Sequence, residues 1–267
     1  MTSFFLVTRH SSPVTLFMHR FYLPPERCTG TALRLDEREA HHALHVLRVK
    51  RGEPVVVLDG VGHEFLCEIA DCSPKNVTLS VKQKNVVPPP RCPITLLQAV
   101  PKGKIIESII QKSVELGAHR IVPLLTDRVV TELGEKDKAN KQVKWQQVAI
   151  EAIKQCGAAW LPKIETPTTI QQFLAGKEKF DLSLVGSLQT DRRHPRECFQ
   201  EFRVKHGRLP ERVAVWIGPE GDFTLDELKA IQTSGAQPIS LGRLVLRVET
   251  AAIYCLAIIS YELQAAS

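Results

Sequence analysis

From residue 94 to the C-terminus, short apolar runs alternate with longer segments of helical spacing, and this alternation constrains the fold most strongly. Parallel strands need a crossover between them, usually a helix, so the pattern predicts an α/β domain with a mostly parallel sheet. The strands are expected at 94–99, 120–125, 182–185, 213–217 and 238–241. Helices are expected from about 103 to 116, within 138–156, near 196–205, from Thr224 onward, and from about 249 to 263.

The chain before residue 88 has a different pattern and predicts a smaller domain. Short β-rich runs at 54–58, 65–69 and 77–81 have glycine turns between them, and one helix with the capping-box pattern Asp36-x-x-Glu39 precedes them. Short strands with one helix are typical of a small β-barrel. The predicted organisation is a poorly ordered extension at 1–17, a barrel domain at 18–87, a proline-rich linker at 88–93 and the α/β domain at 94–267.

The composition argues against three classes of protein: disulfide-stabilised, zinc-stabilised and membrane-spanning. The seven cysteines are odd in number and none forms a C-x-x-C pair, which argues against a disulfide framework and a structural zinc site. This cysteine usage fits a reducing compartment, so we expect a cytoplasmic protein. The longest apolar run, 251–259, is too short to span a bilayer. The formal net charge of +6 is compatible with a polyanionic partner.

The segment 217–224 (IGPEGDFT) lies between an expected strand and an expected helix. Ligands of parallel sheets bind at the carboxyl ends of the strands. Gly218 and Gly221 permit close approach of the backbone to a ligand, and the helix N-terminus presents unpaired N–H groups. The segment has neither the G-x-G-x-x-G pattern nor the Walker lysine, so no dinucleotide site or P-loop is supported. A tight turn without a ligand is an equally weighted alternative.

A second segment, 241–251 (LGRLVLRVETA), also follows a strand and precedes a helix. Gly242 again permits close approach to a ligand. Arg247 and Glu249 are charged residues in an apolar run, so we expect them to be paired or functional. The simpler hypothesis is an ion pair of Arg247 with Glu249 or Glu220 that only joins loops.

The start of the small domain is basic and aromatic, and it is a candidate surface for phosphate contacts and base stacking. A core strand is the alternative interpretation of Phe21 and Tyr22. His41 and His45 are spaced as metal ligands on a helix, but no further ligand completes a set, so we expect no metal. The basic and aromatic residues of this segment are His19, Arg20, Phe21, Tyr22, His41, His42, His45, Arg48, Lys50 and Arg51.

Taken together, these motifs resemble the RsmE family of the SPOUT superfamily, bacterial enzymes that methylate N3 of one uridine in 16S ribosomal RNA. The resemblance extends from about Met18 to the C-terminus. It is carried by Met18–Leu23, His42-x-x-x-Val46-Leu47-Arg48, Lys112-x-x-Glu115-Leu116-Gly117, Gln155-Cys156-Gly157, Ile217–Gly221 and the segment from Leu241 to Ala251.

The resemblance implies a PUA-like N-terminal barrel that handles RNA and a C-terminal domain whose chain forms a trefoil knot. It also implies a homodimer that acts on the small ribosomal subunit and uses S-adenosylmethionine as its cofactor, without a metal. The cofactor-binding residues implied are Leu184, Gly186, Ile217, Gly218, Pro219, Glu220, Gly221, Leu241, Gly242 and Leu246. The RNA-binding residues implied are His19, Arg20, Tyr22, His42, Arg48 and Arg128.

N3 of uracil becomes a good nucleophile only when its proton leaves, so the enzyme must align N3 with the methyl group and favour that loss. Arg247 is the candidate that stabilises negative charge on a uracil oxygen. Either Glu249 or Glu220 is the candidate proton acceptor, and the sequence does not decide between them.

This chain departs from the family pattern at Ala158, where an Arg is common, and at Asp222, where a second Gly is common. Asp127 in Thr126-Asp127-Arg128 is a milder departure. Two alternatives follow: a non-catalytic RNA-binding or ribosome-assembly factor that kept the fold, and a SPOUT methyltransferase with another RNA target.

Overall fold

The structure is a computed structural model that describes residues 18–73, 76–129, 134–188 and 192–264. The expected extension at 1–17 lies outside these residues. Internal contacts divide the chain into two compact units. The N-terminal unit contains the chain up to Pro89 together with residues 157–160, and the C-terminal unit contains 90–156 and the chain from Leu161 onward. Among the described helices, none is long and apolar enough to cross a membrane.

The N-terminal unit is built on one five-stranded sheet with the strand order β1-β3-β4-β5-β2. β1 is parallel to β3, and the other neighbouring pairs are antiparallel. Where a barrel was expected, the described strands form this sheet with β1 and β2 at its edges. The strands are β1 (His19–Tyr22), β2 (Ala32–Arg34), β3 (Pro54–Leu58), β4 (His63–Ser73) and β5 (Asn76–Val86).

A helical segment contributes to the core of this sheet. It begins as α1 (Glu37–His41), where the side chain of Asp36 accepts a hydrogen bond from the Glu39 N–H at 2.8 Å. It continues as a π-helix, His42–Leu47, and ends at Arg48, which has a left-handed φ of 55°. Ala43 of this segment and Phe21 of β1 are fully buried in one apolar cluster. The core-strand interpretation is therefore confirmed for Phe21.

Residues 157–160 join the N-terminal unit through main-chain and indole contacts. The Gly62 N–H donates to the Ala159 carbonyl at 3.0 Å. The indole N–H of Trp160 donates to the carbonyls of Val87, at 3.0 Å, and Pro88, at 3.1 Å. A Cβ at Gly62 would lie 2.6 Å from the Trp160 ring, so only glycine fits there. This part of the chain therefore belongs to the first unit, although it follows the linker by more than 60 residues.

The C-terminal unit contains a seven-stranded parallel sheet. Its order is β12-β10-β11-β6-β7-β8, and β9 also pairs with β7. The carboxyl ends of β12, β10, β11 and β6 therefore lie next to one another at one edge of the sheet. The strands are β6 (Ile94–Ala99), β7 (Ala118–Leu125), β8 (Lys163–Ile164), β9 (Thr168–Thr169), β10 (Leu182–Gly186), β11 (Val213–Ile217) and β12 (Gln237–Ile239).

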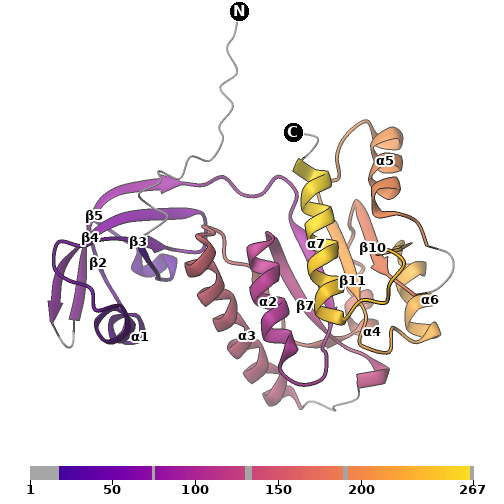
Figure 1. Cartoon of the computed structure of the whole chain (residues 1–267), viewed down its shortest axis with the longest axis horizontal. Coiled ribbons are helices and arrows are strands. Elements are labelled where there is room, and N and C mark those ends of the chain that lie inside the picture. The colour runs from indigo at the N-terminus through magenta and orange to yellow at the C-terminus, as the bar shows by residue number, and fades with distance from the viewer. Residues whose placement is uncertain (1–17, 74–75, 130–133, 189–191, 265–267) are drawn as a thin grey trace, which may run out of the picture. The chain divides into compact units, whose positions relative to one another are not determined.

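Six α-helices of the described chain flank this sheet. α2 packs against α3 and α7, α5 packs against α7, and α4 packs against α6. In Figure 1, α2, α3 and α7 lie side by side in front of the strands. The helices are α2 (Ile105–Glu115), α3 (Glu135–Cys156), α4 (Ile170–Ala175), α5 (Pro195–His206), α6 (Leu225–Thr233) and α7 (Val248–Gln264).

The sequence predicted five of these strands and five of these helices to within a few residues. Its last strand was placed too far along the chain, since β12 ends at Ile239 rather than at 241. It missed β8, β9 and α4, because two-residue strands and a six-residue helix are too short to show a period.

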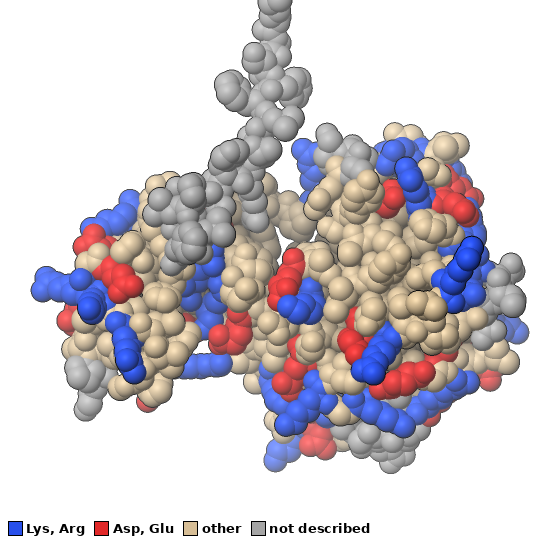
Figure 2. Space-filling model, in the orientation of Figure 1, with Lys and Arg blue, Asp and Glu red and all other residues tan. Residues whose placement is uncertain are grey.

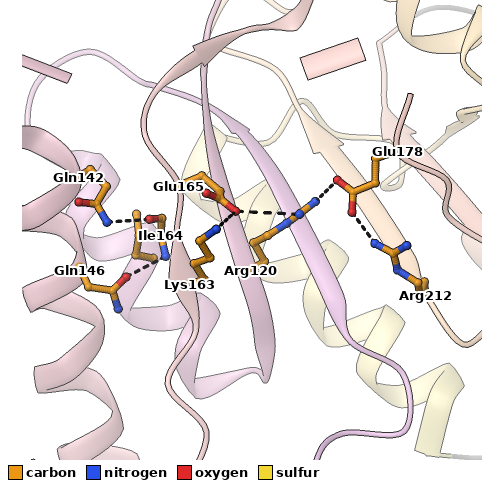
Figure 3. Close-up of polar contacts among 8 residues, drawn as sticks. All are labelled: Arg120, Gln142, Gln146, Lys163, Ile164, Glu165, Glu178 and Arg212. Carbon is orange, nitrogen blue, oxygen red and sulfur yellow. Dashed lines mark hydrogen bonds and ion pairs between the residues drawn. The ribbon is translucent and has the colours of Figure 1, made fainter. Parts of the chain in front are cut away.

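The amino ends of the strands are held by a network of charges opposite the edge that carries the glycine loops (Figure 3). Arg120 of β7 donates to Glu178 at 2.6 Å, and Arg212 bonds the other oxygen of the same carboxylate. Lys163 of β8 pairs with Glu165 at 2.9 Å. Through Glu178, Arg120 and Arg212 link the start of β7 to the segments that lead into β10 and β11.

Candidate active site

A cavity of about 460 Å³ lies at the carboxyl edge of the C-terminal sheet. It is formed by the loops that follow three neighbouring strands, β10, β11 and β12, together with the first turn of α7 and the start of α2. The volume is within the range of small-molecule sites, which extends from about 300 to 1,000 Å³. The sheet order thus brings together loops that are separated by up to 60 residues in the sequence.

Most residues that the sequence singled out for a cofactor line this cavity. Arg247 and Glu249, the candidates for chemistry, line it as well. The predicted cofactor residues found in the wall are Gly186, Ile217, Gly218, Pro219, Glu220, Leu241, Gly242 and Leu246.

Two predicted residues lie outside the described cavity wall. Leu184 is fully buried in the middle of β10. Gly221 faces away toward Arg128, whose guanidinium donates to the Gly221 carbonyl. A Cβ at Gly221 would lie 3.3 Å from the Arg128 side chain. Both residues therefore belong to the strand and the loop that form the site without lining the cavity themselves.

The three charged candidates differ in their environments. Glu220 accepts a hydrogen bond from the Lys102 N–H at 3.1 Å, which joins it to the loop after β6. Arg247 is exposed and Glu249 is half-buried. Within the described part of the chain, Arg247 forms no ion pair with Glu249 or Glu220. The hypothesis of a purely structural ion pair is therefore not supported here.

Sequence reasoning missed several residues of the wall. Arg192 donates to the Ser187 carbonyl at 3.2 Å and brings a second guanidinium to the cavity. Leu244 and Val245 are 80% and 76% exposed, respectively. Leu244 and Val245 lie within the segment 241–251, so the sequence offered a reason to include them in the site. Ile105 lies in no such motif. The residues missed are Ile105, Leu188, Arg192, Leu244, Val245, Val248 and Ala251.

The predicted RNA-binding residues, apart from Arg128, lie in the N-terminal unit. Arg20 lies against Gly157, where a Cβ would be 3.1 Å from its Nε. His19 is 3.9 Å from Glu53, and burial raises the pKa of Tyr22 above its usual value. His42 is half-buried and Arg48 is exposed at the end of the π-helix.

Across the described residues, no group of three or more His, Cys, Asp or Glu side chains has the arrangement of a metal site. The rings of His41 and His45 are in contact, with centroids 4.5 Å apart, and they belong to no such group.

Comparison with known families defines the class of protein. Residues 88–260 match the model of an RNA methyltransferase domain, and residues 35–82 match the model of an RNA methyltransferase PUA domain. The chain is therefore an RNA methyltransferase with an N-terminal PUA domain. The part of the chain that matches the methyltransferase model contains the C-terminal parallel sheet.

Individual relatives define the family. A ribosomal RNA small subunit methyltransferase E from Synechocystis sp. is 32% identical over 97% of this chain and 82% of its own length. The protein of the same name from Bacillus subtilis is 30% identical over 84% of this chain and 88% of its own length. The chain belongs to the ribosomal RNA small subunit methyltransferase E family, as the sequence motifs indicated.

Solved structures agree with this assignment. A Legionella pneumophila methyltransferase in complex with S-adenosylmethionine has a TM-score of 0.81 and 33% identity, covering 93% of this chain and 98% of that one. The Neisseria gonorrhoeae ribosomal RNA small subunit methyltransferase E, bound to S-adenosylmethionine, has a TM-score of 0.79 and 25% identity, covering 91% and 97%.

Proposed function

We propose that this protein transfers a methyl group from S-adenosylmethionine to N3 of one uridine in 16S ribosomal RNA. The observation that carries the proposal is the cavity at the carboxyl edge in a member of this methyltransferase family. Three loops meet there beside an exposed Arg247 that forms no ion pair with another described residue. Small-subunit ribosomal RNA is the target in the names of the relatives. The relatives' names do not specify an atom or a nucleotide, so methylation at N3 of a single uridine is our own proposal.

The residues of the wall fit the proposed cofactor. Backbone groups of the glycine loops can reach the adenosine part, and Ile217, Leu241 and Leu246 supply apolar contact. Gly242 has a φ of 111°, a conformation that favours glycine, and it opens the third loop. Leu184 and Gly221 belong to the strand and the loop that form this wall. When bound, the cofactor supplies a methyl group that its positive sulfonium already activates, so no metal is required.

The three charged candidates have different proposed roles in the reaction. Arg247 has no ion-pair partner among the residues that the structure describes, and it can approach a uracil oxygen and stabilise the negative charge that develops there as N3 loses its proton. Glu220 already accepts a hydrogen bond from Lys102, which favours a role in holding loops together. We therefore assign proton acceptance to Glu249, which lines the cavity two residues after Arg247.

RNA binding is assigned to the N-terminal unit, with residues 18–87 as the RNA-binding domain, 88–93 as the linker and 94–267 as the methyltransferase domain. The match to a PUA domain at 35–82 supports this assignment. We propose that His19, Arg20, Tyr22, His42 and Arg48 contact RNA. The bond from Arg128 to Gly221 favours a structural contribution from that arginine in addition to any contact with RNA.

We also propose a homodimer in the cytoplasm, with a trefoil knot around the cavity loops. The apolar surface of α7 supports the dimer: Tyr254 and Tyr261 lie seven residues apart on one helical face and are 45% and 67% exposed. A helix that is apolar on nearly all sides is normally buried. Figure 2 shows a broad area of uncharged residues on the face of the C-terminal unit that carries α7.

The test uses small ribosomal subunits from cells that lack this modification. The full-length protein is incubated with the subunits and labelled S-adenosylmethionine, and nucleosides of the 16S RNA are separated by mass spectrometry. We expect labelled N3-methyluridine at one position. Label in transfer RNA supplied in a parallel reaction, with none in the 16S RNA, would favour a methyltransferase with another target. Binding of the subunits without any binding of S-adenosylmethionine would favour a non-catalytic assembly factor.

A further inference from the structure

The turn between β11 and α6 contains a residue in an unusual conformation. Asp222 has a φ of 63°, in the left-handed region that most residues with a Cβ avoid and that glycine, asparagine and aspartate enter more readily. The turn is closed by a hydrogen bond in which the Asp222 N–H donates to the Pro219 carbonyl at 2.9 Å. A glycine would fit the same backbone. What the aspartate adds at this position is therefore its carboxylate.

The carboxylate of Asp222 joins two walls of the cavity. One oxygen accepts a hydrogen bond from the N–H of Phe223 at 2.8 Å. The other accepts from the N–H of Leu188 at 3.1 Å. Leu188 lies in the loop after β10, and Asp222 lies in the loop after β11, the neighbouring strand. Both residues line the cavity, so this carboxylate sets the separation of the two loops.

The same contact explains why residue 218 is a glycine. A Cβ at Gly218 would lie 3.2 Å from Oδ1 of Asp222 and 3.2 Å from the backbone nitrogen of Phe223. Both contacts are tighter than ordinary packing. The sequence suggested that this glycine allows the backbone to approach a ligand. The geometry shows a second requirement: the space beside Gly218 holds the Asp222 carboxylate.

We propose that Asp222 is a positioning residue for cofactor binding. Its carboxylate holds the backbone of Leu188 at the distance from the 218–222 turn that the cofactor needs, and it does not take part in methyl transfer itself. The inference rests on the proposed function, because it takes the cavity as the site of S-adenosylmethionine. It predicts that removing the carboxylate weakens cofactor binding and leaves the chemical step unchanged.

Two variants separate the carboxylate from the backbone. Asp222→Gly keeps a residue suited to positive φ and removes both hydrogen bonds. Asp222→Asn keeps the size and one acceptor oxygen, and asparagine also accepts the left-handed region. Asp226→Gly is the matched control, because Asp226 is exposed in the first turn of α6 and lies outside the cavity wall.

Each protein is titrated with S-adenosylmethionine by calorimetry, its KM and kcat are measured, and amide exchange is followed at Leu188. For Asp222→Gly we expect the Kd and KM for S-adenosylmethionine to rise about tenfold, which is the size of one lost charge-assisted hydrogen bond. We expect kcat at saturation to change by less than about twofold and the Leu188 amide to exchange faster. Asp222→Asn should recover part of the affinity, with a rise of about threefold. Asp226→Gly should bind S-adenosylmethionine as the wild type does.

Several results would overturn the inference. Wild-type affinity in Asp222→Gly, or an equal loss of affinity in Asp226→Gly, would show that the carboxylate positions nothing in the site. If Asp222→Gly does not fold, unchanged affinity and unchanged Leu188 exchange in Asp222→Asn would reject the inference. If the wild type itself binds no S-adenosylmethionine, the proposed function fails, which is a different result from a wild type that binds and a variant that binds equally.

Discussion

Arg247 is the residue on which the proposed chemistry depends most directly. It lines the cavity and forms no ion pair with its neighbours among the described residues. We expect Arg247→Ala to lower kcat by about 10²- to 10³-fold, as the loss of one donor to a developing negative charge typically does. The measurement is methyl transfer to small subunits at saturating S-adenosylmethionine, with circular dichroism and the melting temperature as controls for folding. Unchanged kcat would remove Arg247 from the reaction.

At the scale of single residues, local sequence patterns and the family resemblance together predicted most of the cofactor residues that line the cavity. Glycine and proline in loops after strands indicate where a ligand can approach, and charges in an apolar run singled out Arg247 and Glu249. The resemblance added the reaction in which these two residues have roles. The role of Asp222 could not be predicted, because it depends on the N–H of Leu188, which is 34 residues away in the sequence. Contacts between loops follow from the order of strands in the sheet, and a single sequence does not give that order.

At the scale of elements, the start of α6 fixes one wall of the cavity. Thr224 and Glu227 form a reciprocal cap, with the Glu227 carboxylate accepting from the Thr224 N–H at 2.8 Å. The other oxygen of Glu227 accepts from the Asp127 N–H at 3.0 Å, and the Glu227 residue is 2% exposed. One buried carboxylate thus connects the helix to the loop that carries Arg128.

Removal of this carboxylate should cost more than removal of the cap hydroxyl. We expect Thr224→Ala to destabilise the protein by about 1 kcal/mol and Glu227→Ala by about 3 kcal/mol, since the second change leaves two backbone donors without a charged acceptor. For a domain of this size, these losses correspond to melting temperatures lower by roughly 2–4 °C and roughly 6–12 °C. Equal shifts in the two variants, measured by calorimetry, would contradict a structural role for the contact with Asp127.

The cap of α6 was visible in the sequence as Thr224-x-x-Glu227, because a capping box is local and its two halves are three residues apart. The second partner of Glu227 was not visible, since Asp127 is 100 residues away. Long separation along the sequence also explains why the contacts of residues 157–160 with the N-terminal unit were not predicted. Trp160 follows a helix of the C-terminal unit, and nothing in its local sequence indicates that its indole bonds to Val87 and Pro88.

At the scale of the whole molecule, the exposed apolar face of α7 leads to the last prediction. Exposed aromatic residues on one helical face are typical of surfaces that pair with another chain. We expect the wild type to have about twice the 29.9 kDa mass of one chain in solution. The double variant Tyr254→Arg with Tyr261→Arg should be a monomer, because two buried charges without partners would oppose association. Light scattering after size-exclusion chromatography measures both masses.

Val143→Arg is the matched control for this experiment, since Val143 is 67% exposed on α3 and lies outside the tyrosine face. It should keep the mass of the dimer and the activity of the wild type. If the cavity requires the second chain, the tyrosine double variant should lose methyl transfer together with the dimer while keeping its helical content. A wild type that is monomeric at micromolar concentration and fully active would reject the dimer. A dimer that survives the two arginines would place its interface on another face.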